Sequence, residues 1–212
     1  MTEEEQKINQ GFDRGVDYGV MRDKLVKEYE RLDNLLYNDE LPPAAHRICS
    51  FKLAYCLIAM IQLRNGSRIS EAVDAFRKFI SCKKFTQRQY IKIAKSESIK
   101  YKRDTKEKYI TKRRNREMMF PNKWISVSHI DTISSYIKDI SNKRLQKRVL
   151  DYMLKYHKCN THSLRYAFIN YMLYDQKRPM TDIAKFVGHS SINQLLTYTQ
   201  LKNTQQIFDL DI

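Results

Sequence analysis

Three basic side chains and one tyrosine come close together near the end of the sequence. His162 and Arg165 are three residues apart, so they are neighbours on one face if this segment is helical. His189 follows the glycine that ends a short predicted helix, and Tyr198 comes nine residues later. Cations gathered around a phenol are what a phosphate diester needs if a tyrosine oxygen is to attack it. This group therefore predicts that the chain cuts and rejoins DNA through a covalent tyrosine link.

The other parts of such a reaction also have candidates in the sequence. Arginine suits the non-bridging phosphate oxygens, because it stays protonated and offers a planar fork of donors. Arg68 and Arg165 are the candidates for this role. His162 and His189 can donate hydrogen bonds or move protons near neutral pH. A lysine can protonate the leaving 5′-hydroxyl, and Lys95, at the end of a predicted strand, is our candidate.

The whole chain is strongly basic. Its 212 residues carry a formal net charge of +15 at pH 7, and the pI is about 9.6. This charge predicts a polyanionic partner, with nucleic acid favoured over a membrane surface. We find no apolar run as long as a transmembrane helix, and the acidic, polar N-terminus is unlike a signal peptide. We therefore expect an intracellular protein, in the cytoplasm or nucleoid, or in a host cell if the source is a virus.

The hydrophobic pattern predicts helices at both ends and a small sheet between them. Apolar residues recur at helical spacing before and after the middle third, and Asn65-Gly66 stops the second helix. Thr161 and Thr181 are expected to cap two of the later helices. The predicted helices cover residues 22–36, 48–63, 69–80, 130–140, 145–156, 162–174 and 181–188. The expected fold is α+β and mostly helical.

The segment between residues 82 and 124 predicts antiparallel strands. Residues 89–94 alternate polar and apolar, and two further short apolar runs follow a long basic stretch. We expect two or three strands with a charged hairpin that contacts DNA backbone phosphates; a solubilising face is the alternative. The residues assigned to this contact are Lys112, Arg113, Arg114 and Arg116.

The cysteines predict no metal site. None of the four forms a CxxC pair, so a zinc ribbon is not expected. Cys159 and His162 form a single CxxH, which has no second pair. Cys49 and Cys56 are seven residues apart on an apolar helix and are expected to be core thiols.

Four segments together resemble the tyrosine recombinases of the phage-integrase family. LRNGSRISE at 63–71 is similar to the family's TGxRxSE box, and THSLRYAF at 161–168 to its HxLRHxF box. IAKFVGHSS at 183–191 is similar to IxxxLGHSS, and TYT at 197–199 matches the nucleophile site. The order and spacing of all four agree. The resemblance covers residues 44–200, and Tyr166 stands where many relatives carry a further histidine.

The resemblance implies a mechanism and a fold. Tyr198 would attack the scissile phosphate and form a 3′-phosphotyrosine bond, while Arg68, His162, Arg165 and His189 hold the phosphate. Lys95 would protonate the departing 5′-hydroxyl, with Lys112 as its rival on the long hairpin. The fold would be the recombinase catalytic domain with its small antiparallel sheet. Neither metal nor ATP nor a small-molecule substrate is implied, and no membrane partner.

The resemblance also implies an organisation. Residues 44–212 would form the catalytic domain, and 1–43 a short helical segment where most relatives carry a larger core-binding domain. The working form would be a homotetramer on two DNA duplexes that integrates or excises a mobile element, as in archaeal or viral relatives. A type IB topoisomerase-like enzyme is the nearest alternative. A non-catalytic DNA-binding regulator with the same fold is the second.

Overall fold

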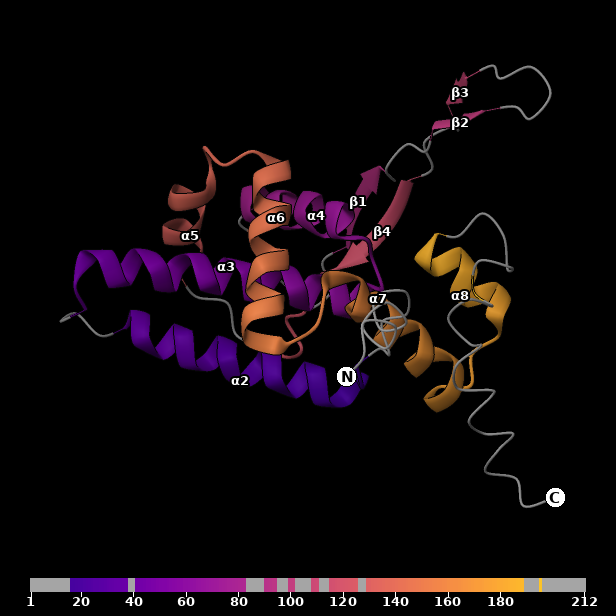
Figure 1. Cartoon of the computed structure of the whole chain (residues 1–212), viewed down its shortest axis with the longest axis horizontal. Coiled ribbons are helices and arrows are strands. Elements are labelled where there is room, and N and C mark those ends of the chain that lie inside the picture. Colours follow the sequence, from indigo (N-terminus) through magenta and orange to yellow (C-terminus); the bar gives the residue numbers. More distant parts are fainter. Residues whose placement is uncertain are drawn as a thin grey trace, which may run out of the picture.

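The computed structural model is built mainly from α-helices (Figure 1), which confirms the mostly helical prediction. It describes residues 16–37, 41–82, 90–94, 99–101, 108–110, 115–125, 129–188 and 195; for residues 90–94, 99–101, 108–110 and 115 only the backbone is described. The helices are α2 (Tyr18–Leu36), α3 (Pro43–Asn65), α4 (Ile69–Cys82), α5 (Ile130–Ile137), α6 (Asn142–Tyr152), α7 (Thr161–Asn170) and α8 (Met180–Val187).

Two of these helices continue directly into single π-helical turns. The turn η1 (Met153–His157) follows α6, and η2 (Tyr171–Asp175) follows α7. The wider π turn is rare, and where it occurs it frequently lies at a functional site.

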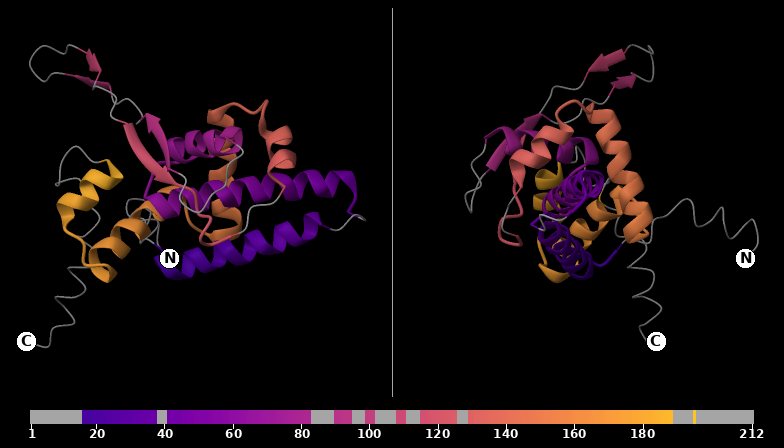
Figure 2. Two further views of the ribbon diagram at one scale, coloured as in Figure 1. Left: turned by 180° about the vertical axis from the view of Figure 1, so that it is seen from behind. Right: turned by 90° about the vertical axis from the view of Figure 1, so that its left-hand side faces the viewer.

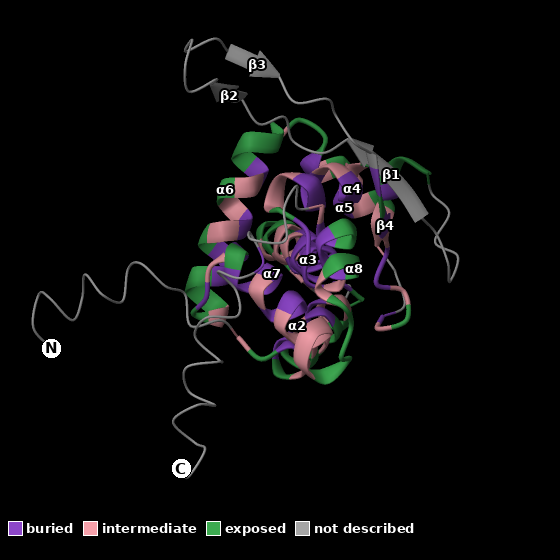
Figure 3. Ribbon diagram, turned by 90° about the vertical axis from the view of Figure 1, so that its right-hand side faces the viewer, coloured by how far each residue is buried: buried purple, intermediate pink, exposed green. Residues whose placement is uncertain are grey.

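The core is organised around α3, which runs through the middle of the molecule (Figures 1 and 2). Its buried residues lie on every side of the helix, and α2 runs antiparallel beside it. Leu25, Tyr29 and Leu32 form the apolar stripe of α2, and each is at most 1% exposed. Figure 3 shows the buried positions concentrated on α3 and on the inward sides of the helices around it. The predicted boundary between residues 43 and 44 falls in the first turn of α3, and α2 and α3 share one core.

The structure corrects the statement that no apolar run reaches membrane-spanning length. By length and composition, α3 with its 23 residues could cross a bilayer. The sequence pattern hides this because Arg47 and Lys52 interrupt its first half, whereas the stretch from Leu53 to Leu63 is almost entirely apolar and buried. In this fold those residues contact other helices of the same chain.

Four short strands form two antiparallel pairs between α4 and α5. β1 (Tyr90–Ala94) pairs with β4 (Asn115–Met119), so that Tyr90 lies opposite Met119. β2 (Ile99–Tyr101) pairs with β3 (Lys108–Ile110) further along the same excursion of the chain. In Figure 1 the second pair lies away from the helices, whereas β4 returns towards the C-terminal end of α3.

Candidate active site at the turn between α3 and α4

The α3–α4 turn begins with a glycine that the packing requires. Gly66 ends α3 in the left-handed conformation, with φ of 54°, as the Asn65-Gly66 pair predicts. A Cβ atom at this position would lie 2.3 Å from Cδ1 of Phe168. The ring of Phe168 therefore rests on the turn, and α7 lies close against the end of α3.

Arg165 joins this turn to the end of α8. Its side chain is buried, with 1% exposed, and Nη1 donates a 2.6 Å hydrogen bond to the carbonyl of Gly66. Its Nη2 donates to the carbonyl of Val187 at 3.1 Å. Three of the segments that carry the predicted site residues thus meet at one guanidinium.

Arg116 from β4 makes a parallel set of contacts. Its Nη2 donates to the carbonyl of Asn65 at 2.7 Å, and its Nη1 donates to the carbonyl of Val187 at 3.4 Å. Arg116 and Arg165 therefore bind two consecutive carbonyls of the α3–α4 turn and share the carbonyl at the end of α8. We call these two residues the arginine clamp. It fixes the turn and the end of α8 relative to each other.

Arg116, assigned to a DNA contact from the sequence, has a structural role in the free chain. Arg116 is only 6% exposed and lies inside the arginine clamp. Successive strand residues point to opposite faces, so Arg116 faces the same side as Met118, and Phe120 continues this buried series. Glu117 between them is exposed. This alternation was the available signal, and the surrounding run of basic residues concealed it.

Glu71 neutralises the arginine clamp from the side of α4. Its Oε2 accepts from Nη1 of Arg116 at 3.0 Å, and the two side chains are 1% and 4% exposed. Burial lowers the pKa of Arg116, whereas the Glu71 carboxylate acts in the opposite direction. An arginine keeps its proton under such opposing influences. Glu71 is therefore the structural partner of the buried Arg116 guanidinium.

Arg68 is held at the start of α4 with its side chain towards solvent. The backbone N–H of Arg68 donates to Oε2 of Glu71 at 3.1 Å, which is the glutamate half of a capping box. Its Nη1 lies 3.8 Å from Oε1 of Glu71, and its side chain is 45% exposed. Glu71 therefore fixes the backbone of Arg68 while leaving much of the guanidinium accessible.

His162 lies in the first turn of α7 and is exposed. The cap of this helix is Asn160 and not Thr161, because Oδ1 of Asn160 accepts from the N–H groups of His162 and Ser163 at 2.7 and 3.0 Å. The ring of His162 packs edge-on against Tyr166 at 5.0 Å. His162 and Arg165 therefore leave α7 in the same region, one towards solvent and one towards the arginine clamp.

Two buried amide side chains tie these segments together, and these contacts were not predicted from the sequence. Nε2 of Gln62 donates to the carbonyls of Thr161 and Ser67, which links α3 to the starts of α7 and α4. Asn65 exchanges two 2.8 Å hydrogen bonds with the backbone of Met119, and so holds β4 against α3. The linking role of a buried amide at a helix end can be recognised only when its tertiary hydrogen-bond partner is known.

Several predicted site residues lie outside the described part of the chain. Lys95 follows the last residue of β1 directly, and His189 follows Gly188, which ends α8 in the left-handed conformation. Helix α8 begins at Met180 after the N-cap residue Pro179, so the predicted cap Thr181 lies inside the helix. Within the described residues, no group of three or more His, Cys, Asp or Glu side chains could hold a metal ion. The site residues that the structure does not describe are Lys95, Lys112, Arg113, Arg114, His189 and Tyr198.

Comparison with known proteins places the chain in a family. It is 44% identical over 214 residues to "Putative integrase V10" of the Sputnik virophage, covering 97% of this chain and 92% of the relative. It is 31% identical over 198 residues to "Putative integrase ORF241" of Acidianus two-tailed virus, covering 93% and 67%. An uncharacterized protein of Methanocaldococcus jannaschii, MJ0770, is 28% identical over 236 residues, covering 99% and 95%.

No protein-family model and no solved structure matches the chain. An identity of 44% over nearly the full length of both chains nevertheless shows that the chain and the virophage protein share a family. The helical fold, the basic charge and the clustered cations are consistent with a protein that acts on DNA. The chain belongs to the family of viral integrases that these relatives represent.

Proposed function

We propose that this integrase is a tyrosine recombinase. Tyr198 attacks the scissile phosphate, so that an O–P bond forms to the phenol oxygen and the bond to the 5′-oxygen breaks. Lys95 gives a proton to that leaving oxygen. A 5′-hydroxyl of the partner duplex then attacks the phosphotyrosine and releases Tyr198, and the bond energy is conserved throughout.

The observation that carries this proposal is the arginine clamp. Arg165 and Arg116 bring the α3–α4 turn, the first turns of α7 and the end of α8 to one place. Arg68 comes two residues after Gly66, and His189 two residues after Val187. The segments that the resemblance assigns to phosphate binding are therefore neighbours in space.

The described phosphate-binding residues differ in how they can act. Arg68 and His162 are exposed and can meet a phosphate without rearrangement. Arg165 is 1% exposed in the free chain, so the proposal requires DNA binding to uncover its guanidinium. The carbonyls of Gly66 and Val187 hold the plane of that guanidinium in advance, which lowers the cost of presenting its donors to a phosphate.

The substrate in this proposal is double-stranded DNA, and the outcome is integration or excision of a mobile element inside a host cell. Both viral relatives carry the word integrase in their names. A homotetramer holding two duplexes would give each strand exchange its partner end. The net charge of +15 supplies the attraction to the backbone.

A suicide-substrate assay tests the nucleophile. A pool of nicked duplexes with randomised flanks is incubated with the protein, and covalent adducts are trapped on a denaturing gel and sequenced. The proposal expects an adduct with the natural chain and with Tyr174→Phe, and none with Tyr198→Phe. An unchanged adduct in Tyr198→Phe would refute the assignment. Relaxation of supercoiled plasmid without joining of two duplexes would favour the topoisomerase-like alternative.

A further inference from the structure

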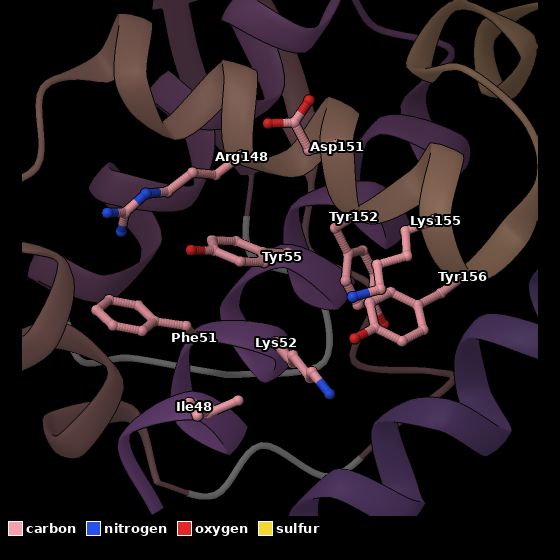
Figure 4. Close-up of a pocket in the computed structure, with 9 residues that line it drawn as sticks. All are labelled: Ile48, Phe51, Lys52, Tyr55, Arg148, Asp151, Tyr152, Lys155 and Tyr156. Atoms are coloured by element: carbon pink, nitrogen blue, oxygen red, sulfur yellow. The ribbon is translucent and has the colours of Figure 1, made fainter. Parts of the chain in front are cut away.

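A second site lies on the other half of α3, away from the arginine clamp. Residues of α3, α6 and η1 line a solvent-accessible pocket of about 310 Å³ (Figure 4). Tyr55, the lining residue of α3 nearest to the clamp, is ten residues before Asn65, which is roughly 15 Å along the helix. The pocket therefore cannot belong to the candidate active site.

The walls of this pocket are mainly aromatic. Phe51 and Tyr55 lie one helical turn apart with nearly parallel rings, whose centroids are 6.3 Å apart. Tyr152 continues the series at 5.9 Å from Tyr55, and Tyr156 lies 5.1 Å from Tyr152. The four rings form one continuous series, in which Tyr152 is only 4% exposed and the other three are accessible. Tyr156, carried by the π turn η1, is the most exposed residue of the four, at 44%.

Positive groups are mounted on these rings. The guanidinium carbon of Arg148 lies 5.3 Å from the ring centre of Phe51. The ammonium groups of Lys52 and Lys155 lie 4.8 and 5.4 Å from the ring centre of Tyr156. A hydrogen bond from Lys52 lowers the pKa of the Tyr156 hydroxyl, as expected where positive charge is concentrated. A ligand that matches this pocket is flat and carries negative charge.

A second hollow adjoins the first and shares Tyr156 with it. Its volume is about 550 Å³, and α2 and η1 line it with basic side chains. Glu28 accepts two 2.8 Å hydrogen bonds from Arg31, so these two charges offset each other. The remaining lysines of this hollow form no ion pair within the described part of the chain. They are Lys24, Lys27 and Lys158.

We propose that these two hollows bind a single strand of DNA. An unpaired base stacks on the rings of the first hollow, and the neighbouring phosphates contact the lysines of the second. Stacking on aromatic side chains with cations tracking the backbone is how proteins hold single strands without reading sequence. Asp151 is the carboxylate that lines the first hollow, and in Figure 4 it points away from the rings.

Single-stranded DNA fits better than a duplex because duplex bases are already stacked on each other. A duplex could use the lysines but not the aromatic pocket. This inference rests on the proposed function, because strand exchange separates the bases near the cleaved phosphates. The site would hold a strand that has left its duplex until it pairs with the partner.

The test measures binding in the Tyr198→Phe background, so that it does not depend on covalent chemistry. Fluorescence anisotropy follows a labelled oligothymidylate of about 15 nucleotides and a duplex of the same length at one salt concentration. Tyr156→Ala is expected to weaken single-strand binding at least about fivefold and duplex binding by less than about twofold. Tyr156→Phe keeps the ring and should bind as the parent does. Tyr37→Ala, at an exposed tyrosine outside both hollows, is the matched control.

Two results of the binding measurement would overturn the proposal. One is an equal loss of single-strand and duplex binding in Tyr156→Ala, which would make the surface a plain backbone contact. The other is unchanged single-strand binding. Photo-crosslinking with 5-iodouracil in the oligonucleotide gives a readout without mutation, and it should label a peptide of η1 or of α3 around Phe51. Labelling confined to other peptides would also contradict the proposal. If the suicide substrate gives no adduct but Tyr156→Ala selectively weakens single-strand binding, the proposed chemistry fails and the single-strand site stands.

Discussion

Among the site residues, Arg116 is the one whose substitution should destabilise the fold most. It donates to two carbonyls and to the Glu71 carboxylate while almost fully buried. Removing one partner of a buried ion pair leaves the other charge without compensation, which costs more than the pair itself contributes. The position therefore tolerates neither loss of charge nor change of shape.

We predict that Arg116→Met lowers the free energy of unfolding by about 3–5 kcal/mol, because Glu71 is left charged and buried. Urea unfolding followed by circular dichroism measures this change. The double variant Arg116→Met with Glu71→Gln should recover part of the loss, since it removes the stranded charge. A single-variant loss below about 1 kcal/mol would show that water reaches Glu71.

The identity of the general acid is a second question at this scale. Lys95 and Lys112 are replaced by alanine separately, and cleavage is measured on the suicide substrate. The true acid should lose cleavage on the ordinary phosphate and regain much of it when sulfur replaces the leaving 5′-oxygen, because a thiolate leaves without a proton. The other lysine should lose little on either substrate. Equal losses that sulfur does not rescue would exclude both.

At the scale of elements, the α3–α4 turn is the part that most depends on a single conformation. Gly66 combines positive φ with the ring of Phe168 where a side chain would begin. We predict that Gly66→Ala lowers the free energy of unfolding by about 2 kcal/mol or more, through backbone strain and this overlap. Urea unfolding measures it, and reduced adduct formation should accompany it because the Gly66 carbonyl holds Arg165.

Gly19→Ala is the matched control for this prediction. Gly19 lies in the first turn of α2 without positive φ, and a Cβ there would have Oδ1 of Asp17 as its nearest neighbour at 3.4 Å. Alanine in a helix is better than glycine by roughly 0.5–1 kcal/mol. The control should therefore be neutral or stabilising. If both variants destabilise equally, the conformational argument for Gly66 is wrong.

Comparing the predicted elements with the observed ones shows which features the sequence could predict. Helix periodicity predicted the C-terminal ends of α2, α3 and α4 to within two residues, and Gly66 ends α3 as the Asn65-Gly66 pair predicts. The predicted starts of α2 and α3 were four and five residues late. The caps at Thr161 and Thr181 were wrong by one or two positions, since Asn160 and Pro179 compete for the same role. The burial of Arg116 was missed because its partners Glu71 and Asn65 are more than forty residues away in sequence.

For the whole molecule, charge sets how strongly it should hold DNA. Each phosphate neutralised by a lysine or arginine releases counterions, so affinity falls steeply with salt. We predict a linear fall of log affinity against log salt for a non-specific duplex, with a slope of about −0.9 per phosphate contacted. Anisotropy titrations at several salt concentrations measure it. A slope near zero would contradict a backbone-dominated interface.

The position of α2 has a consequence for how the chain is made. Helix α3 is apolar enough to resemble a membrane span, and α2 covers part of it in the folded protein. A chain is synthesised from its N-terminus, so α2 leaves the ribosome before α3. The partner of this apolar helix therefore already exists when α3 emerges. A circular permutation that moved α2 to the C-terminus would reverse this order. The apolar surface of α3 would then stay exposed to other proteins of the cell until α2 is made.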